Sequence, residues 1–98
     1  MEDKMKNLFN VLNNQNMNDQ VMNAQNVRAD IMGELEAIIM YQSHISATDN
    51  SMVRKTLSDI MDEEKVHVGQ LFGLLFKLDP ESKTLFEKGY NEFMEENK

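Results

Sequence analysis

Three residues with metal-binding side chains occupy positions where the sequence otherwise places aliphatic core residues. Glu34 interrupts a stripe of apolar side chains that step by three or four along residues 27–45, and Glu64 and His67 interrupt a similar stripe along residues 57–74. A carboxylate buried without a partner is strongly unfavourable or becomes protonated. Three such groups in one small core therefore require a compensating partner, and a divalent cation would supply it.

The spacing of these residues predicts that they meet. Glu34 lies 15 residues before Asp49, in a stretch typical of turns, and Glu64 lies 15 residues after it. At about 1.5 Å of rise per residue, each carboxylate lies roughly 22 Å from the turn. An antiparallel hairpin would thus place the two glutamates at the same level, with His67 one helical turn beyond Glu64 on the same face.

Two carboxylates and one imidazole form half of a familiar set of ligands. The chain has no Cys, and a sulfur-free set of this kind suits iron or manganese better than structural zinc. Di-iron carboxylate bundles use one Glu from each of two helices and a Glu-x-x-His motif from each of the other two. A two-fold dimer of this chain would supply four Glu and two His, with the axis between the metals. We therefore predict a di-iron centre with two Fe per dimer, in which Mn, Ca or Zn could substitute.

The elements that must position these residues are all helical. Apolar periodicity predicts helices over about 19–47, 52–78 and 80–95, separated by the turn-forming residues 48–51 and by Asp79-Pro80, an N-cap followed by proline at the first helical position. Residues 1–18 are predicted to form an N-terminal extension, either a short helix or disordered, and residues 19–98 one helical hairpin domain with a C-terminal helix. Two such hairpins are expected to dimerise into a four-helix bundle, because one hairpin leaves part of its apolar stripe uncovered.

Composition excludes several other classes of function. The chain has 10 Lys and Arg against 17 Asp and Glu, a net charge of −7, which argues against a nucleic-acid partner. No apolar run approaches the roughly 20 residues that span a bilayer, so a cytoplasmic protein with no membrane partner is expected. The nine Met residues are interpreted as flexible core filler.

The motifs around the three ligands resemble those of encapsulated ferritins within the ferritin-like superfamily. Glu34 is followed seven residues later by Tyr41, and the segment Glu63-Glu64-Lys65-Val66-His67 contains the Glu-x-x-His motif. The resemblance covers roughly residues 28–90, including the Asp79-Pro80 junction.

This resemblance implies a ferroxidase that oxidises Fe(II) with O2 at a site shared by two chains. It implies Glu34, Glu64 and His67 as iron ligands, Tyr41 beside the centre, and Glu36 at a secondary metal site. It also implies assembly of dimers into a ring such as a decamer, and a place as iron-handling cargo inside an encapsulin nanocompartment.

Two other functions remain open from the sequence. One is a non-catalytic helical interaction protein in which Glu and His bind a structural metal. The other is a rubrerythrin-like peroxidase, which is disfavoured because the chain has no Cys for the usual rubredoxin-type iron.

Overall fold

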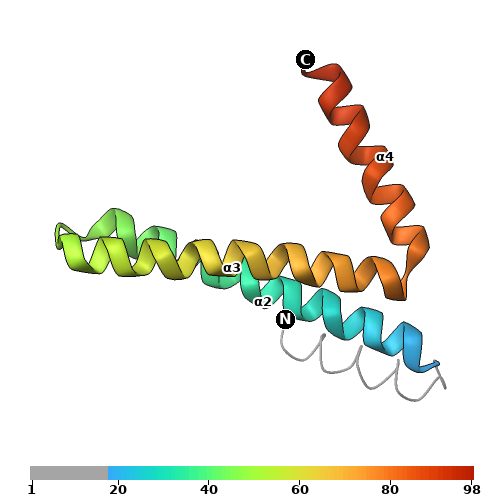
Figure 1. The fold of residues 1–98 in the computed structure, drawn as a ribbon, viewed down its shortest axis with the longest axis horizontal. Coiled ribbons are helices and arrows are strands. Elements are labelled where there is room, and N and C mark those ends of the chain that lie inside the picture. Colours follow the sequence, from blue (N-terminus) through green and yellow to red (C-terminus); the bar gives the residue numbers. More distant parts are fainter. Residues whose placement is uncertain (1–17) are drawn as a thin grey trace, which may run out of the picture.

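The structure, a computed structural model, describes residues 18–98, which form three helices. Helices α2 (Asp19–Ala47) and α3 (Ser51–Leu78) form a long antiparallel hairpin, and α4 (Pro80–Glu96) leaves its open end at a steep angle (Figure 1). The predicted all-α hairpin with a C-terminal helix is confirmed. The predicted N-terminal extension lies, up to residue 17, outside the described residues.

Side-chain caps fix where the hairpin helices begin. Asn18 caps α2 and Asn50 caps α3, and each side-chain oxygen accepts a hydrogen bond from the backbone N–H three residues further on, at 2.8 and 3.1 Å. Such caps satisfy N–H groups that have no partner inside the helix. Residues 48–50 make the turn, and α3 begins at Ser51, one residue earlier than predicted.

A polar cluster that we call the Arg28 clasp joins α2 to the start of α4. Arg28 Nη2 donates to Asp79 Oδ2 at 2.7 Å and to Ser82 Oγ at 2.8 Å, and the Ser82 hydroxyl donates to the same Asp79 oxygen at 2.6 Å. Beside it, the Gln20 side chain donates to the backbone carbonyl of Leu78 at 2.7 Å, at the last turn of α3. The open end of the hairpin is therefore closed by side chains of α2.

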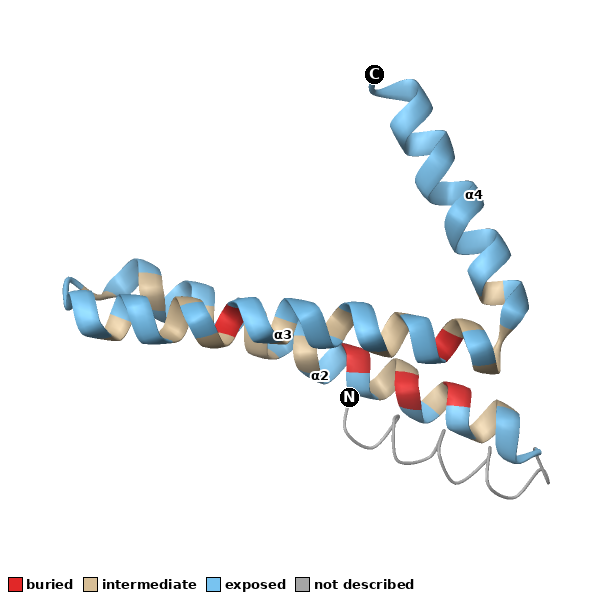
Figure 2. Ribbon diagram, viewed as in Figure 1, coloured by how far each residue is buried: buried red, intermediate tan, exposed pale blue. Residues whose placement is uncertain are grey.

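The apolar core is a narrow seam between α2 and α3. Figure 2 shows the buried residues on the facing sides of these two helices and none on α4. The core consists of Ala24, Val27, Ile31, Met61 and Leu75.

Several side chains expected in the core are exposed instead. Leu35 and Leu74 belong to the predicted stripes but are 45% and 48% exposed, so not every position of a stripe faces the other helix. The interpretation of Met as core filler holds for Met61 but is wrong for others, since Met32 and Met52 are largely exposed. One chain thus leaves considerable apolar surface uncovered.

Removing the Asp79 carboxylate should loosen the junction between α3 and α4. Hydrogen bonds from the side chains of Ser82 and Arg28 lower the pKa of Asp79 from its ordinary value of 3.8. The folded chain therefore favours the ionised form, so this stabilisation is present above pH 3.8 and is lost as the pH falls through the lowered folded value. We expect Asp79→Ala to lower the melting temperature by roughly several degrees at pH 7 and by less at an acid pH well below 3.8.

Thermal melts followed by circular dichroism at both pH values would measure this difference. Asp59→Ala is the matched control, because Asp59 forms an exposed i,i+4 ion pair with Lys55 that contributes little. An equal loss for Asp79→Ala at both pH values would contradict a role for its charge.

Candidate metal centre

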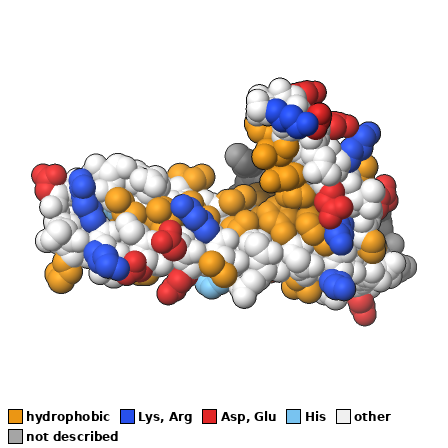
Figure 3. Space-filling model, turned by 45° about the horizontal axis from the view of Figure 1, so that its top comes forward, with side chains coloured by type: hydrophobic (Ala, Val, Ile, Leu, Met, Phe, Trp, Pro, Cys, Tyr) orange, Lys and Arg blue, Asp and Glu red, His pale blue; other side chains and the backbone are white. Residues whose placement is uncertain are grey.

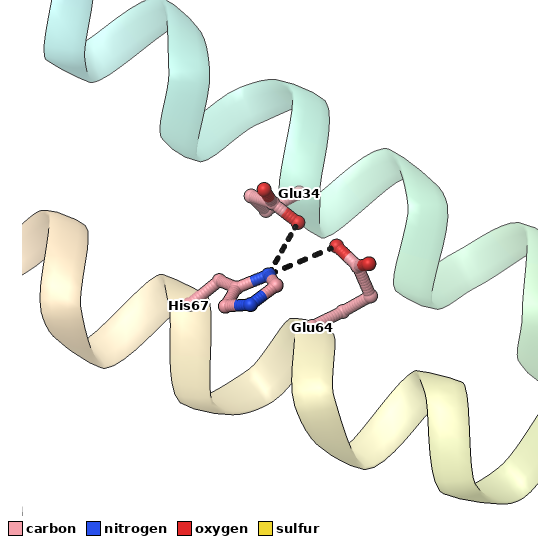
Figure 4. A group of neighbouring side chains, drawn as sticks. All are labelled: Glu34, Glu64 and His67. Atoms are coloured by element: carbon pink, nitrogen blue, oxygen red, sulfur yellow. Dashed lines mark ion pairs between the residues drawn. The ribbon is translucent and has the colours of Figure 1, made fainter.

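Glu34, Glu64 and His67 converge halfway along the hairpin. Glu34 comes from α2, the other two come from α3, and the three side chains point toward one another (Figure 4). His67 Nδ1 lies 3.8 Å from Glu34 Oε2 and 3.8 Å from Glu64 Oε2. One ligand atom from each residue lies within 4.8 Å of the other two. The equal distances from the turn predicted this meeting, and the antiparallel helices provide it.

The cluster is shielded on one side and open on the other. The side chains of Glu64 and Glu34 are 18% and 27% exposed, whereas that of His67 is 47% exposed. Leu74, two helical turns after His67 on the same face of α3, is also about half exposed. A second molecule could therefore approach the cluster from the side on which His67 lies.

The donor atoms suit a cation of the predicted kind. Nitrogen and carboxylate ligands bind such metals at about 2.0–2.2 Å, so donors on one ion lie about 3–4 Å apart. The two separations of 3.8 Å from His67 Nδ1 already lie within that range. Within residues 18–98, this is the one group of three or more acidic or histidine side chains with ligand atoms so close together.

The remaining predicted residues lie outside the cluster. Tyr41 is half-buried, two turns beyond Glu34 on the same face of α2, and no hydrogen bond joins its hydroxyl to Glu34 or Glu64 in the described part of the chain. Glu36 is exposed beside a shallow groove of about 490 Å³ that Gly33 and Met40 also line. A secondary metal site at Glu36 remains a prediction, and so does a role for Tyr41 beside the centre.

No helix in the described part of the chain is both long and apolar enough to span a membrane.

An antiparallel hairpin that carries a Glu on one helix and a Glu-x-x-His motif at the same level on the other defines a ferritin-like all-α protein.

Comparisons with known proteins identify the family within that class. The sequence model of the EncFtn-like family matches residues 10–90. The chain therefore belongs to the EncFtn-like family, and the resemblance to encapsulated ferritins is confirmed. The crystal structure of the encapsulated ferritin domain from Pyrococcus furiosus has the same fold, with a TM-score of 0.76 and 35% sequence identity over 81% of each chain.

Two curated relatives extend this comparison. A ferritin-like–encapsulin shell fusion protein from Pyrococcus furiosus is 41% identical over 69 residues, which are 70% of this chain and 20% of the fusion protein. The encapsulin nanocompartment cargo protein EncC from Myxococcus xanthus is 43% identical over 58 residues, which are 59% of this chain and 45% of that protein. The chain thus spans a fifth of the first relative and less than half of the second.

Proposed function

We propose that this protein is a ferroxidase whose substrate, Fe(II), is oxidised by O2 at a di-iron centre shared between two copies of the chain. The observation that carries the proposal is the convergence of Glu34, Glu64 and His67 in the hairpin seam. In the reaction, two Fe(II) ions give up two electrons, and O2 takes up these electrons and two protons to form hydrogen peroxide. Iron would therefore be bound, oxidised and released as Fe(III).

The ligand residues have distinct tasks in this reaction. The carboxylates of Glu34 and Glu64 supply negative charge, which favours Fe(III) over Fe(II) and so promotes the loss of an electron. His67 supplies a neutral nitrogen donor and must be deprotonated to bind. The half-buried carboxylates hold their donor atoms in place before iron arrives, while the exposed imidazole lies on the side from which a second copy would complete the centre.

Counting ligands supports the shared centre. Three side chains are too few to hold two ions, whereas two chains related by a two-fold axis supply four carboxylates and two imidazoles. Exposed apolar surface beside the cluster, above all Leu74, would be covered in the same step. Two hairpins would then complete the four-helix bundle that one hairpin leaves unfinished.

The names of the relatives support a place for this ferroxidase inside an encapsulin shell. One relative is fused to a shell protein and another is named as encapsulin cargo. We propose the same partner here, with the protein packed as a ring of dimers in a cytoplasmic nanocompartment. Oxidised iron would then be delivered to the interior of that compartment.

Native mass spectrometry should show the shared centre directly. We expect the protein to gain iron in steps of two ions per dimer, because neither chain alone completes a site. Mixing anaerobic protein with Fe(II) and then admitting air should produce ferric absorbance faster than in buffer. The binding of two iron ions by a monomer would contradict the shared centre. A metal-loaded dimer that oxidises Fe(II) no faster than buffer would instead indicate a structural metal site.

A further inference from the structure

Met61 is a buried methionine next to the candidate metal centre. It lies three residues before Glu64 on α3, which places it on nearly the same face of the helix, with about 4.5 Å of rise between the two residues. Its side chain is only 8% exposed, in the seam between α2 and α3. A thioether therefore lies within one helical turn of a candidate ligand and is screened from solvent.

The other methionines of the hairpin and of α4 are much more accessible. Hydrophobic side chains reach the surface of both parts of the molecule (Figure 3). Within residues 18–98, Met61 is the one buried methionine, and four others are 50–73% exposed: Met32, Met40, Met52 and Met94. Met32 gives the sharpest contrast, because it is only two residues from Glu34 but lies about 160° around α2 from it.

Hydrogen peroxide converts the thioether of methionine into a sulfoxide. The sulfur attacks one oxygen of the peroxide, so an S–O bond forms and the O–O bond breaks. The other oxygen leaves as hydroxide and takes up the remaining proton of the peroxide to give water. The sulfur loses two electrons, and the peroxide gains them. The chain has no Cys, so no thiol of this protein competes for the oxidant.

We propose that Met61 is a self-oxidation site, where peroxide formed at the metal centre oxidises the thioether before it escapes into solvent. This inference rests on the proposed ferroxidase function, which supplies the peroxide. Oxidation by peroxide from solution follows exposure and so favours the four surface methionines. Oxidation from the centre follows proximity and favours Met61. The two routes therefore predict opposite orders of modification.

A sulfoxide at position 61 limits the number of turnovers of the centre. Oxidation turns an apolar side chain into a polar one, and a polar oxygen in an apolar seam is unfavourable without a hydrogen-bond donor. Ala37 offers no such donor, although it lies level with Met61 on α2, since each residue is 12 positions from Asp49 in the turn. The packing beside Glu64 is therefore weakened, and iron oxidation slows as sulfoxide accumulates.

Tandem mass spectrometry after repeated additions of Fe(II) in air tests the modification, with catalase present to destroy peroxide in solution. We expect a gain of about 16 Da, one oxygen atom, at Met61 and none at Met32 or Met52. Treatment with hydrogen peroxide alone, without iron, should modify Met32 and Met52 before Met61. If Met61 stays unmodified while ferric absorbance appears, or is modified only without catalase, the inference is overturned. Absence of ferric absorbance would instead contradict the proposed function itself.

Met61→Leu tests the effect on turnover, because leucine keeps the apolar volume and cannot form a sulfoxide. We expect this variant to begin at the wild-type rate of iron oxidation and to lose less of that rate over successive additions of Fe(II). Met52→Leu is the matched control and should slow as the wild type does, since Met52 is 73% exposed and about 18 Å along α3 from Glu64. An equal decline in all three proteins would overturn the role of Met61 in limiting turnover.

Discussion

Replacing Glu64 with glutamine is expected to reduce the rate of Fe(II) oxidation at least about 100-fold, since loss of even an outer partner of a metal ligand costs about 10–100-fold. The substitution keeps the size of the side chain and removes its charge. Glu64 is the least exposed member of the cluster, so a water molecule cannot readily take the place of the lost ligand. Glu34→Gln and His67→Ala should produce losses of the same order.

Ferric absorbance after mixing with Fe(II) in air measures this effect, and circular dichroism shows whether the helices remain. Glu63→Gln is the control for Glu64→Gln, because Glu63 is an exposed neighbour outside the cluster. His44→Ala serves in the same way for His67→Ala, since His44 is an exposed histidine on α2. If Glu64→Gln oxidises iron as fast as Glu63→Gln, the centre lies elsewhere.

Leu74→Asp should separate the two halves of the centre without touching a ligand. Leu74 shares a face of α3 with His67 and is half exposed, so in a metal-centred dimer it would be covered by the second copy. A charge buried there without a partner strongly opposes association. We expect the variant to sediment as a monomer and to lose at least about 90% of its rate of iron oxidation. A loss of only about 1.4 kcal/mol in the free energy of association already lowers the affinity tenfold.

Analytical ultracentrifugation with and without Fe(II), paired with the oxidation assay, measures both consequences. Ile39→Asp is the control, because it introduces the same charge on another face of the hairpin. Ile39 lies about 140° around α2 from Glu34. It should dimerise and oxidise iron as wild type does. A Leu74→Asp protein that stays monomeric yet oxidises iron at the wild-type rate would show that one chain suffices.

The features predictable from the sequence are those that depend on local rules. Helix boundaries follow from caps such as Asn18 and from the Asp79-Pro80 junction, and the meeting of Glu34 with Glu64 follows from equal distances to one turn. Each of these needs only the rise per residue and the preferences of a few residue types. The fold and the proposed ligands could therefore be derived before any coordinates.

Other features depend on contacts that the sequence does not indicate. Arg28 and Asp79 are 51 residues apart, and nothing near either residue identifies the other as its partner. The burial of Met61 and the exposure of Leu35 depend on which part of a broad apolar stripe faces the other helix. The amphipathic pattern predicts α4 as a helix, but the direction in which it leaves the hairpin is set by tertiary contacts alone.

That direction gives the Arg28 clasp a second importance. By fixing the first turn of α4 with charged hydrogen bonds, Arg28 sets the direction in which the whole of α4 leaves the hairpin. A few polar side chains at one end of the hairpin therefore decide where the exposed apolar side chains of α4 are presented.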